Sequence, residues 1–145
     1  MKRTLLCLLL ATAACFSVRA DDKKVLHATL AVDKDTPPTT TFSPDVPKIY
    51  AFYIGDAIKA GDKLRAVWTA EDVGDAAPKG TKIDEATLTA DRDNPSDAFS
   101  LSKPAKGWPL GKYKVEIFDN DKLAQTLQFT INEDDDDADD ASVDD

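Results

Sequence analysis

Side chains that could carry out catalysis are few in this chain. It has one histidine, His27, and two cysteines, Cys7 and Cys15, both near the start of the sequence. A nucleophilic enzyme needs a nucleophile, a base and a group that orients the base, and neither a zinc motif nor a nucleophile elbow is present. His27 alternates with the apolar Leu26 and Ala28, so we expect it to face solvent from a strand. The sequence therefore predicts neither an enzyme nor a cofactor.

Three carboxylates in one polar loop are the candidates for a metal site. Asp91, Asp93 and Asp97 are spaced so that their side chains can converge, and carboxylate oxygens are the ligands that Ca²⁺ prefers. The loop lacks the glycine and the distal glutamate of an EF-hand, and Arg92 offsets part of its negative charge. A solvated loop explains the pattern better, and we keep these three residues only as weak calcium candidates.

A strand-length aromatic run is the candidate binding surface. Residues 49–54 read IYAFYI, so both faces of a strand would be apolar. In a two-layer sandwich only one face meets the core. In the simpler interpretation, the proline-rich segment 33–47 or a neighbouring loop would cover the second face. In the functional interpretation, Tyr50 and Phe52 form an exposed patch that binds a partner or ligand.

The charge of the chain is concentrated at its C-terminus. The formal net charge is -9, which excludes a basic nucleic-acid binder. Residues 133–145, EDDDDADDASVDD, contain nine acids and no base. This segment has too little apolar surface to fold, so we expect a disordered tail. It would solubilise the protein, contact a cationic partner or bind divalent cations weakly.

The N-terminus has the pattern of an export signal. Lys2 and Arg3 precede an apolar run over residues 5–18, and small residues follow at Val18 and Ala20. The run is shorter than the ~20 residues that a membrane-spanning helix needs. We expect residues 1–20 to be a signal peptide cleaved after Ala20, which places the product in the periplasm or outside the cell.

A second processing route stays open. Residues 12–15, TAAC, resemble a bacterial lipobox, in which the cysteine is lipidated and becomes the first residue. Thr12 replaces the usual leucine, and the cleavage site at Ala20 is the better match. Lipidation of Cys15 would anchor the protein to a membrane. Cleavage after Ala20 would instead leave a product without cysteine, and therefore without a disulfide.

Between the signal and the tail, seven segments have the two-residue period or the length of β-strands. Helical periodicity is weak, and turn-rich stretches separate the segments. The predicted strands cover residues 25–32, 49–54, 63–70, 83–90, 98–102, 113–118 and 123–131. Short strands with turns between them favour an antiparallel sandwich of one domain over residues 24–132.

Two sequence features resemble those of an immunoglobulin-like β-sandwich. Trp68 lies at an inward position of a central third strand, as the core tryptophan of that fold does. Residues 110–115, LGKYKV, resemble a tyrosine corner with Tyr113 as its tyrosine. Val115 stands where antibody domains carry a cysteine. The resemblance implies a seven-stranded antiparallel immunoglobulin-like sandwich, and for function it implies binding without naming a ligand.

From these features we expect an extracytoplasmic, non-catalytic binding or interaction module of the bacterial envelope. Its partner would be a protein or another envelope component. Two alternatives remain. A lipid-anchored structural or scaffolding protein would depend on Cys15, and a small secreted hydrolase would depend on paired carboxylates.

Overall fold

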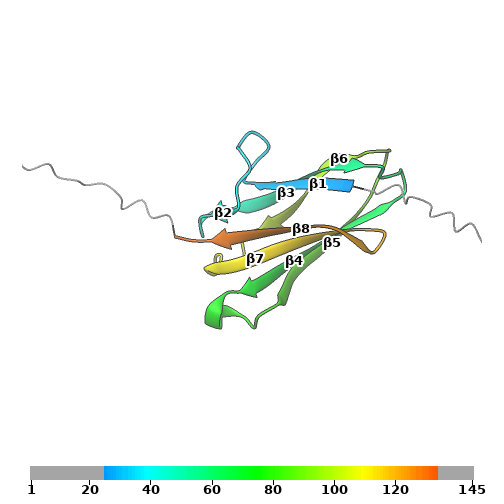
Figure 1. The fold of residues 1–145 in the computed structure, drawn as a ribbon. Coiled ribbons are helices and arrows are strands. Elements are labelled where there is room, and N and C mark those ends of the chain that lie inside the picture. Colours follow the sequence, from blue (N-terminus) through cyan, green and yellow to red (C-terminus); the bar gives the residue numbers. More distant parts are fainter. Residues whose placement is uncertain (1–24, 134–145) are drawn as a thin grey trace, which may run out of the picture.

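Two β-sheets lie face to face in the computed structural model, which describes residues 25–133 (Figure 1). The smaller sheet has the strand order β1-β3-β6, and the larger sheet has the order β2-β8-β7-β4-β5. The strands are β1 (Val25–Ala31), β2 (Thr41–Phe42), β3 (Lys48–Asp56), β4 (Lys63–Asp72), β5 (Thr81–Thr89), β6 (Ser96–Ser102), β7 (Gly111–Asp119) and β8 (Lys122–Ile131). One short 3-10 turn, η1 (Gly74–Ala76), follows β4. Within the described range, no helix is long and apolar enough to cross a membrane.

The sequence predictions for the two ends of the chain cannot be compared with this structure. The predicted signal peptide 1–20, Cys15 within it, and residues 134–145 of the predicted acidic tail all lie outside the described residues.

The predicted sandwich is confirmed, but the predicted count of seven strands is wrong for the described residues. An eighth strand, β2, lies within the proline-rich segment 33–47 and pairs in parallel with Thr130 and Ile131 of β8. Its Phe42 is buried against Phe129, with ring centroids 5.8 Å apart. Two residues are too few to show a two-residue period, so the sequence pattern could not reveal this strand.

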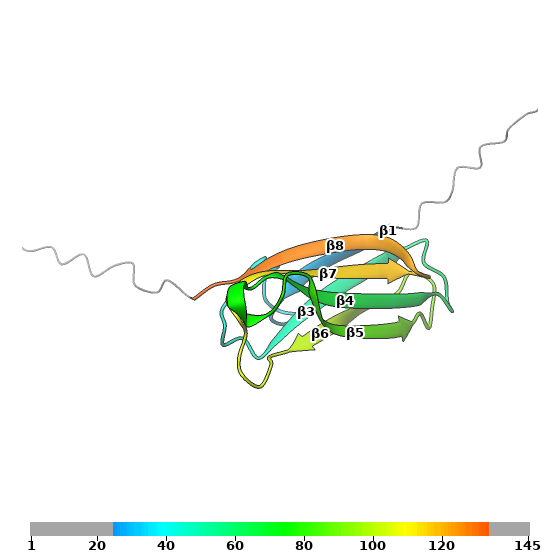
Figure 2. The same cartoon turned by 90° about the horizontal axis from the view of Figure 1, so that it is seen from below.

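The connections between strands are those of the immunoglobulin fold. In chain order, the first, second and fifth long strands form the smaller sheet, and the third, fourth, sixth and seventh form the larger one. These correspond to strands A, B and E facing C, C′, F and G of an immunoglobulin domain, without a described strand D. Figure 2 shows the two layers. The immunoglobulin-like all-β fold follows from this order.

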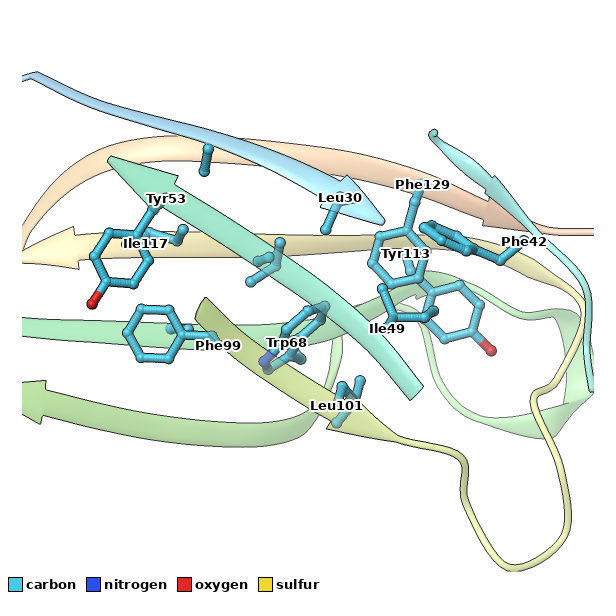
Figure 3. Close-up of a cluster of buried hydrophobic side chains, with 14 of the residues drawn as sticks. Leu30, Phe42, Ile49, Tyr53, Trp68, Phe99, Leu101, Tyr113, Ile117 and Phe129 are labelled. Atoms are coloured by element: carbon cyan, nitrogen blue, oxygen red, sulfur yellow. The ribbon is translucent and has the colours of Figure 1, made fainter. Parts of the chain in front are cut away.

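Aromatic side chains from the larger sheet fill the space between the two layers (Figure 3). Trp68 on β4 and Tyr113 on β7 are at most 1% exposed. The rings of Tyr113 and Phe129 stack with centroids 5.2 Å apart, and Phe129 meets Trp68 edge to face at 6.1 Å. The smaller sheet adds Phe99 and Leu101 from β6 to the same core. Trp68 is therefore a core residue, as the sequence predicts.

The predicted tyrosine corner is present at the start of β7. The Tyr113 hydroxyl donates a hydrogen bond to the backbone carbonyl of Pro109, four residues upstream. The Trp108 ring meets Tyr113 edge to face, and the Trp108 Nε1 donates to the Val46 carbonyl at 2.8 Å. Gly111 has a φ of +144°, and a Cβ there would collide with the backbone of Asp72. The corner thus joins the loop before β7 to β7 itself and to Val46, in the segment that leads into β3.

A side chain closes the outer edge of β1. The Gln125 carboxamide, on β8, accepts a hydrogen bond from Ala28 N at 2.7 Å and donates one to Ala28 O at 3.3 Å. Two residues along, Thr39 N donates to Leu30 O at 2.9 Å. Gln125 therefore satisfies backbone groups that a further strand would otherwise bind, and it also ties the two sheets together.

We expect the Tyr113→Phe substitution to lower the free energy of unfolding by about 1–2 kcal/mol, because it leaves the partly buried Pro109 carbonyl without its donor. Urea denaturation measures the change. Tyr50→Phe removes a hydroxyl from a half-buried surface ring and serves as the control, with an expected change within about 0.5 kcal/mol. Equal effects of the two substitutions would contradict a special role for the corner.

We expect Gln125→Ala to lower the free energy of unfolding by about 1 kcal/mol and to promote self-association, because β1 then presents unpaired backbone groups. Gln128→Ala on the same strand is the matched control. Gln128 is exposed and donates only to the Glu71 carboxylate at 3.3 Å. Urea denaturation and light scattering of both variants decide the matter, and identical curves would exclude edge closure by Gln125.

Candidate functional site

The two solvent-facing surfaces of the sandwich differ in chemistry. The outer face of the larger sheet carries charged side chains that pair with one another. Arg65 and Glu85 approach to 3.5 Å, and Lys82 and Glu85 approach to 2.9 Å. Lys114 pairs with its neighbour Glu116 at 3.2 Å. This face therefore resembles an ordinary solvated surface.

An apolar ridge occupies the outer face of the smaller sheet. Tyr50, Phe52 and Ile54 project outward from β3, which is the central strand of that sheet, and we call these three residues the β3 ridge. The rings of Tyr50 and Phe52 stack with centroids 5.4 Å apart and planes inclined by 21°. Ile54 is 61% exposed, and the two rings are half-buried.

The division of residues 49–54 between two faces is as the sequence predicts. Ile49, Ala51 and Tyr53 point into the core and are at most 3% exposed. The proline-rich segment 33–47 bonds at the edges of both sheets, through Thr39 to Leu30 of β1 and through β2 to β8. Tyr50 and Phe52, on the second face of β3, are half-buried.

Small or polar residues flank the β3 ridge on both sides. In the strand register, Thr29 and Ala98 lie beside Phe52, and His27 and Ser96 lie beside Ile54. A shallow hollow runs over these residues along Phe52 and Ile54. Beside Phe52 the neighbours Thr29 and Ala98 are short, and Ile54 is exposed, so this part of the ridge is open to a partner.

The cationic side chain of Lys48 marks one end of this surface. The Lys48 Nζ lies 5.8 Å from the centroid of the Tyr50 ring, within the range of a cation–π contact. His27 is exposed near the other end, so its predicted solvent-facing position on a strand is confirmed. An apolar ridge with a cation at one end can contact apolar side chains and a neighbouring acidic group of a partner.

The three weak calcium candidates engage different partners. Asp93 accepts a hydrogen bond from Ala60 N at 2.9 Å, and its carboxylate lies 3.7 Å from the Lys59 Nζ. Asp91 lies 3.5 Å from Arg92, and Asp97 accepts a hydrogen bond from Ala98 N at 2.8 Å. Over residues 25–133, no group of three or more histidine, cysteine or acidic side chains is arranged to hold a metal.

A second hollow was not predicted from the sequence. It is almost wholly apolar and lies between the loop before β7 and the β4–β5 hairpin, with Val73, Ala77, Ile83 and Trp108 among its lining residues. The sequence places Trp108 in a turn-rich stretch, KPAKGWPLG. A tryptophan in such a stretch is the one signal that could have pointed to this hollow.

Tyr53 lies beneath the β3 ridge with its ring against Phe99, at a centroid distance of 5.4 Å. Burial, together with the negative charges of Asp97 and Asp91, raises the pKa of Tyr53 to about 12. The folded protein thus holds this phenol in its neutral form above the ordinary pKa of 10.

We expect the stabilising contribution of Tyr53 to be complete below about pH 10 and to be lost as the pH rises toward about 12, because only the unfolded chain ionises in that window. Tyr53→Phe should make the free energy of unfolding fall less steeply between these pH values. Burial also raises the pKa of Tyr113 to about 12, so the double Phe variant should be flatter still. Urea denaturation at a series of pH values tests this. If the free energy of unfolding falls equally steeply with pH in the original protein and in the variants, the prediction is contradicted.

Comparisons with known proteins give likenesses of fold only. No family model and no curated protein matches the chain. Among solved structures, an immunoglobulin-like protein from Pseudomonas aeruginosa is 17% identical with a TM-score of 0.47, over 77% of this chain and 94% of that one. The DNA glycosylase AlkC from Pseudomonas fluorescens is 12% identical with a TM-score of 0.46, over 76% of this chain and 30% of that one.

A third likeness is to a GH3 beta-glucosidase from Bifidobacterium adolescentis, at 11% identity and a TM-score of 0.41, over 74% of this chain and 17% of that one. At such low identities we take the fold from the chain's own features. The strand order and the tyrosine corner at Tyr113 make it an immunoglobulin-like β-sandwich.

Proposed function

We propose that the protein is an extracytoplasmic, non-catalytic binding module of the bacterial envelope, and that it binds a protein partner through the β3 ridge. The observation that carries the proposal is the pair of stacked rings, Tyr50 and Phe52, beside the 61% exposed Ile54. The export signal that the sequence predicts over residues 1–20 supports the location.

The chemistry of the ridge suits a protein surface. Aromatic residues are enriched in the buried centres of interfaces, and a few such anchors provide most of the binding energy. Tyr50 and Phe52 stack on each other, so they already hold a fixed arrangement before a partner arrives. Because these side chains are already held in place, they lose less conformational entropy when a partner binds, which favours affinity.

The hollow along the ridge favours binding over the hydrolase alternative. A glycoside hydrolase needs a pair of carboxylates on either side of the bond that it cleaves. Asp97 is the one acidic residue that lines this hollow in the described part of the chain. The lining therefore supports binding rather than glycoside hydrolysis.

We expect the double substitution Tyr50→Ser and Phe52→Ser to abolish partner binding while the protein stays folded. The loss in free energy of unfolding should be about 1–2 kcal/mol, smaller than the 3–5 kcal/mol expected for Phe99→Ala in the core. Circular dichroism and urea denaturation measure folding. A photoreactive phenylalanine analogue at position 54, introduced in living cells, measures binding through crosslinks.

Phe118→Ser is the matched control, because Phe118 is a half-buried aromatic residue on the outer face of the other sheet, 4.4 Å from the Arg65 guanidinium. It should leave the crosslinks unchanged, and the analogue at position 118 should give none of the same products. Crosslinks that persist in the folded Tyr50/Phe52 variant would refute the ridge as the binding surface.

A further inference from the structure

The described strands leave four long edges, on β1, β5, β6 and the part of β8 before its pairing with β2, and three of them are protected. On β8, the pairing with β7 shifts register, and Gln125 reaches across to Ala28 of β1. The outer edge of β1 is closed by Gln125 and Thr39. The edge strand β5 is paired to β4 with a register shift, and it carries the Lys82–Glu85 ion pair. Bulges and charges of this kind keep other strands from adding to a sheet edge.

The fourth edge, β6, has neither a bulge nor an internal charge after Asp97. Its pairing with β3 is continuous from Ser96 to Ser102. The residues between Asp97 and Lys103 read AFSLS, and their outward side chains are all small. Among the described strands, β6 has a neighbour on one side only.

The backbone geometry shows which N–H and C=O groups of β6 point away from β3 and can bond to another strand. Pro95 O and Lys103 N, at the two ends of β6, both bond to the β3 side, at 2.8 Å and 2.9 Å. Bonded positions alternate along an antiparallel pair, so the odd-numbered residues of β6 bond to β3. The even-numbered residues direct their backbone groups to the open edge: Ala98, Ser100 and Ser102.

We propose that β6 pairs antiparallel with β6 of a second copy of the chain, with Ser100 opposite Ser100 on the two-fold axis. Ala98 of each copy then lies opposite Ser102 of the other, and each of these pairs can exchange two backbone hydrogen bonds. The same register places Asp97 opposite Lys103 at both ends of the pairing. Opposite charges facing each other across two strands stabilise the pair.

The register is limited by the residues that flank β6. Pro95 and Pro104 lack amide hydrogens and bound the stretch that can pair. A shift of two residues in either direction keeps the backbone groups in phase, but Lys103 then faces Pro95 or Phe99 of the other copy. Only the register centred on Ser100 gives both Asp97 and Lys103 an opposite charge.

Pairing changes what Asp97 does. In the single chain its carboxylate accepts a hydrogen bond from Ala98 N, which is one of the open-edge groups. In the dimer Ala98 N bonds to the second copy, and the carboxylate turns to Lys103. The cost of exposing Ala98 N is thus avoided in both states.

The dimer would form one six-stranded sheet with both β3 ridges on the same face. Three strand spacings, about 14 Å, separate the two ridges. The floor between them consists of the short side chains of Ala98, Ser100 and Ser102. The pairing itself does not depend on what Tyr50 and Phe52 bind, so the two proposals fail independently.

Sedimentation of the mature protein over a range of concentrations, at about 0.15 M salt to screen the net charge, tests the pairing. We expect a monomer–dimer equilibrium. Asp97→Lys and Lys103→Asp should each weaken dimerisation about tenfold, because each places like charges opposite at two symmetric positions. The double variant Asp97→Lys with Lys103→Asp should restore the original affinity. A protein that stays monomeric, or a double variant no better than the singles, would overturn the proposal.

Two further variants report on the register and on folding. Ser100→Cys should form a disulfide-linked dimer under mild oxidation, whereas Ser102→Cys, which faces Ala98 in this register, should not. Ser100→Pro should abolish dimerisation without unfolding the chain, because its amide points to the open edge. Thr87→Pro, at the open edge of β5, is the matched control and should leave the dimer intact. Equal crosslinking at both cysteine positions would also overturn the proposal.

Discussion

The fold depends on the burial of apolar side chains from both sheets in one shared core, without a disulfide between the sheets. Val115 is fully buried where antibody domains carry a cysteine, and both cysteines of the chain precede the predicted cleavage site. On the larger sheet, Tyr113 stacks on Phe129, and Trp68 meets Phe129 edge to face. Phe99 and Leu101 of the smaller sheet belong to the same buried core. Burial of such rings removes a large apolar area from water, which is how a sandwich without disulfides holds its two layers together.

Most of the fold could be predicted because its signals are local. A two-residue period identifies a strand and its buried face, so the inward sides of β3 and β7 could be read from residues such as Ile49 and Ile117. The tyrosine corner is a short motif around Tyr113. The strand β2 escaped prediction because its two residues owe their conformation to Phe42 packing on Phe129, a contact between distant parts of the chain.

The candidate site could be predicted only in part, because it also depends on contacts between distant parts of the chain. The sequence shows that Tyr50 and Phe52 share the second face of β3, but the neighbours of that face are set by pairing across strands. The sequence pattern could not show that segment 33–47 bonds at two sheet edges, through Thr39 to β1 and through β2 to β8. The role of Asp97 beside the open edge, and the hollow at Trp108, likewise depend on which loops and strands meet in space.

An uncovered apolar ridge and an open strand edge on one small domain would ordinarily favour aggregation. Two features of this chain oppose that outcome. The outer face of the larger sheet is densely charged, with Arg65, Glu85 and Lys114 in ion pairs, and the chain as a whole carries a net charge of -9. Repulsion between like-charged molecules hinders random contacts. A contact that persists must therefore be specific, with complementary charge and shape at the surface that Tyr50, Phe52 and β6 provide.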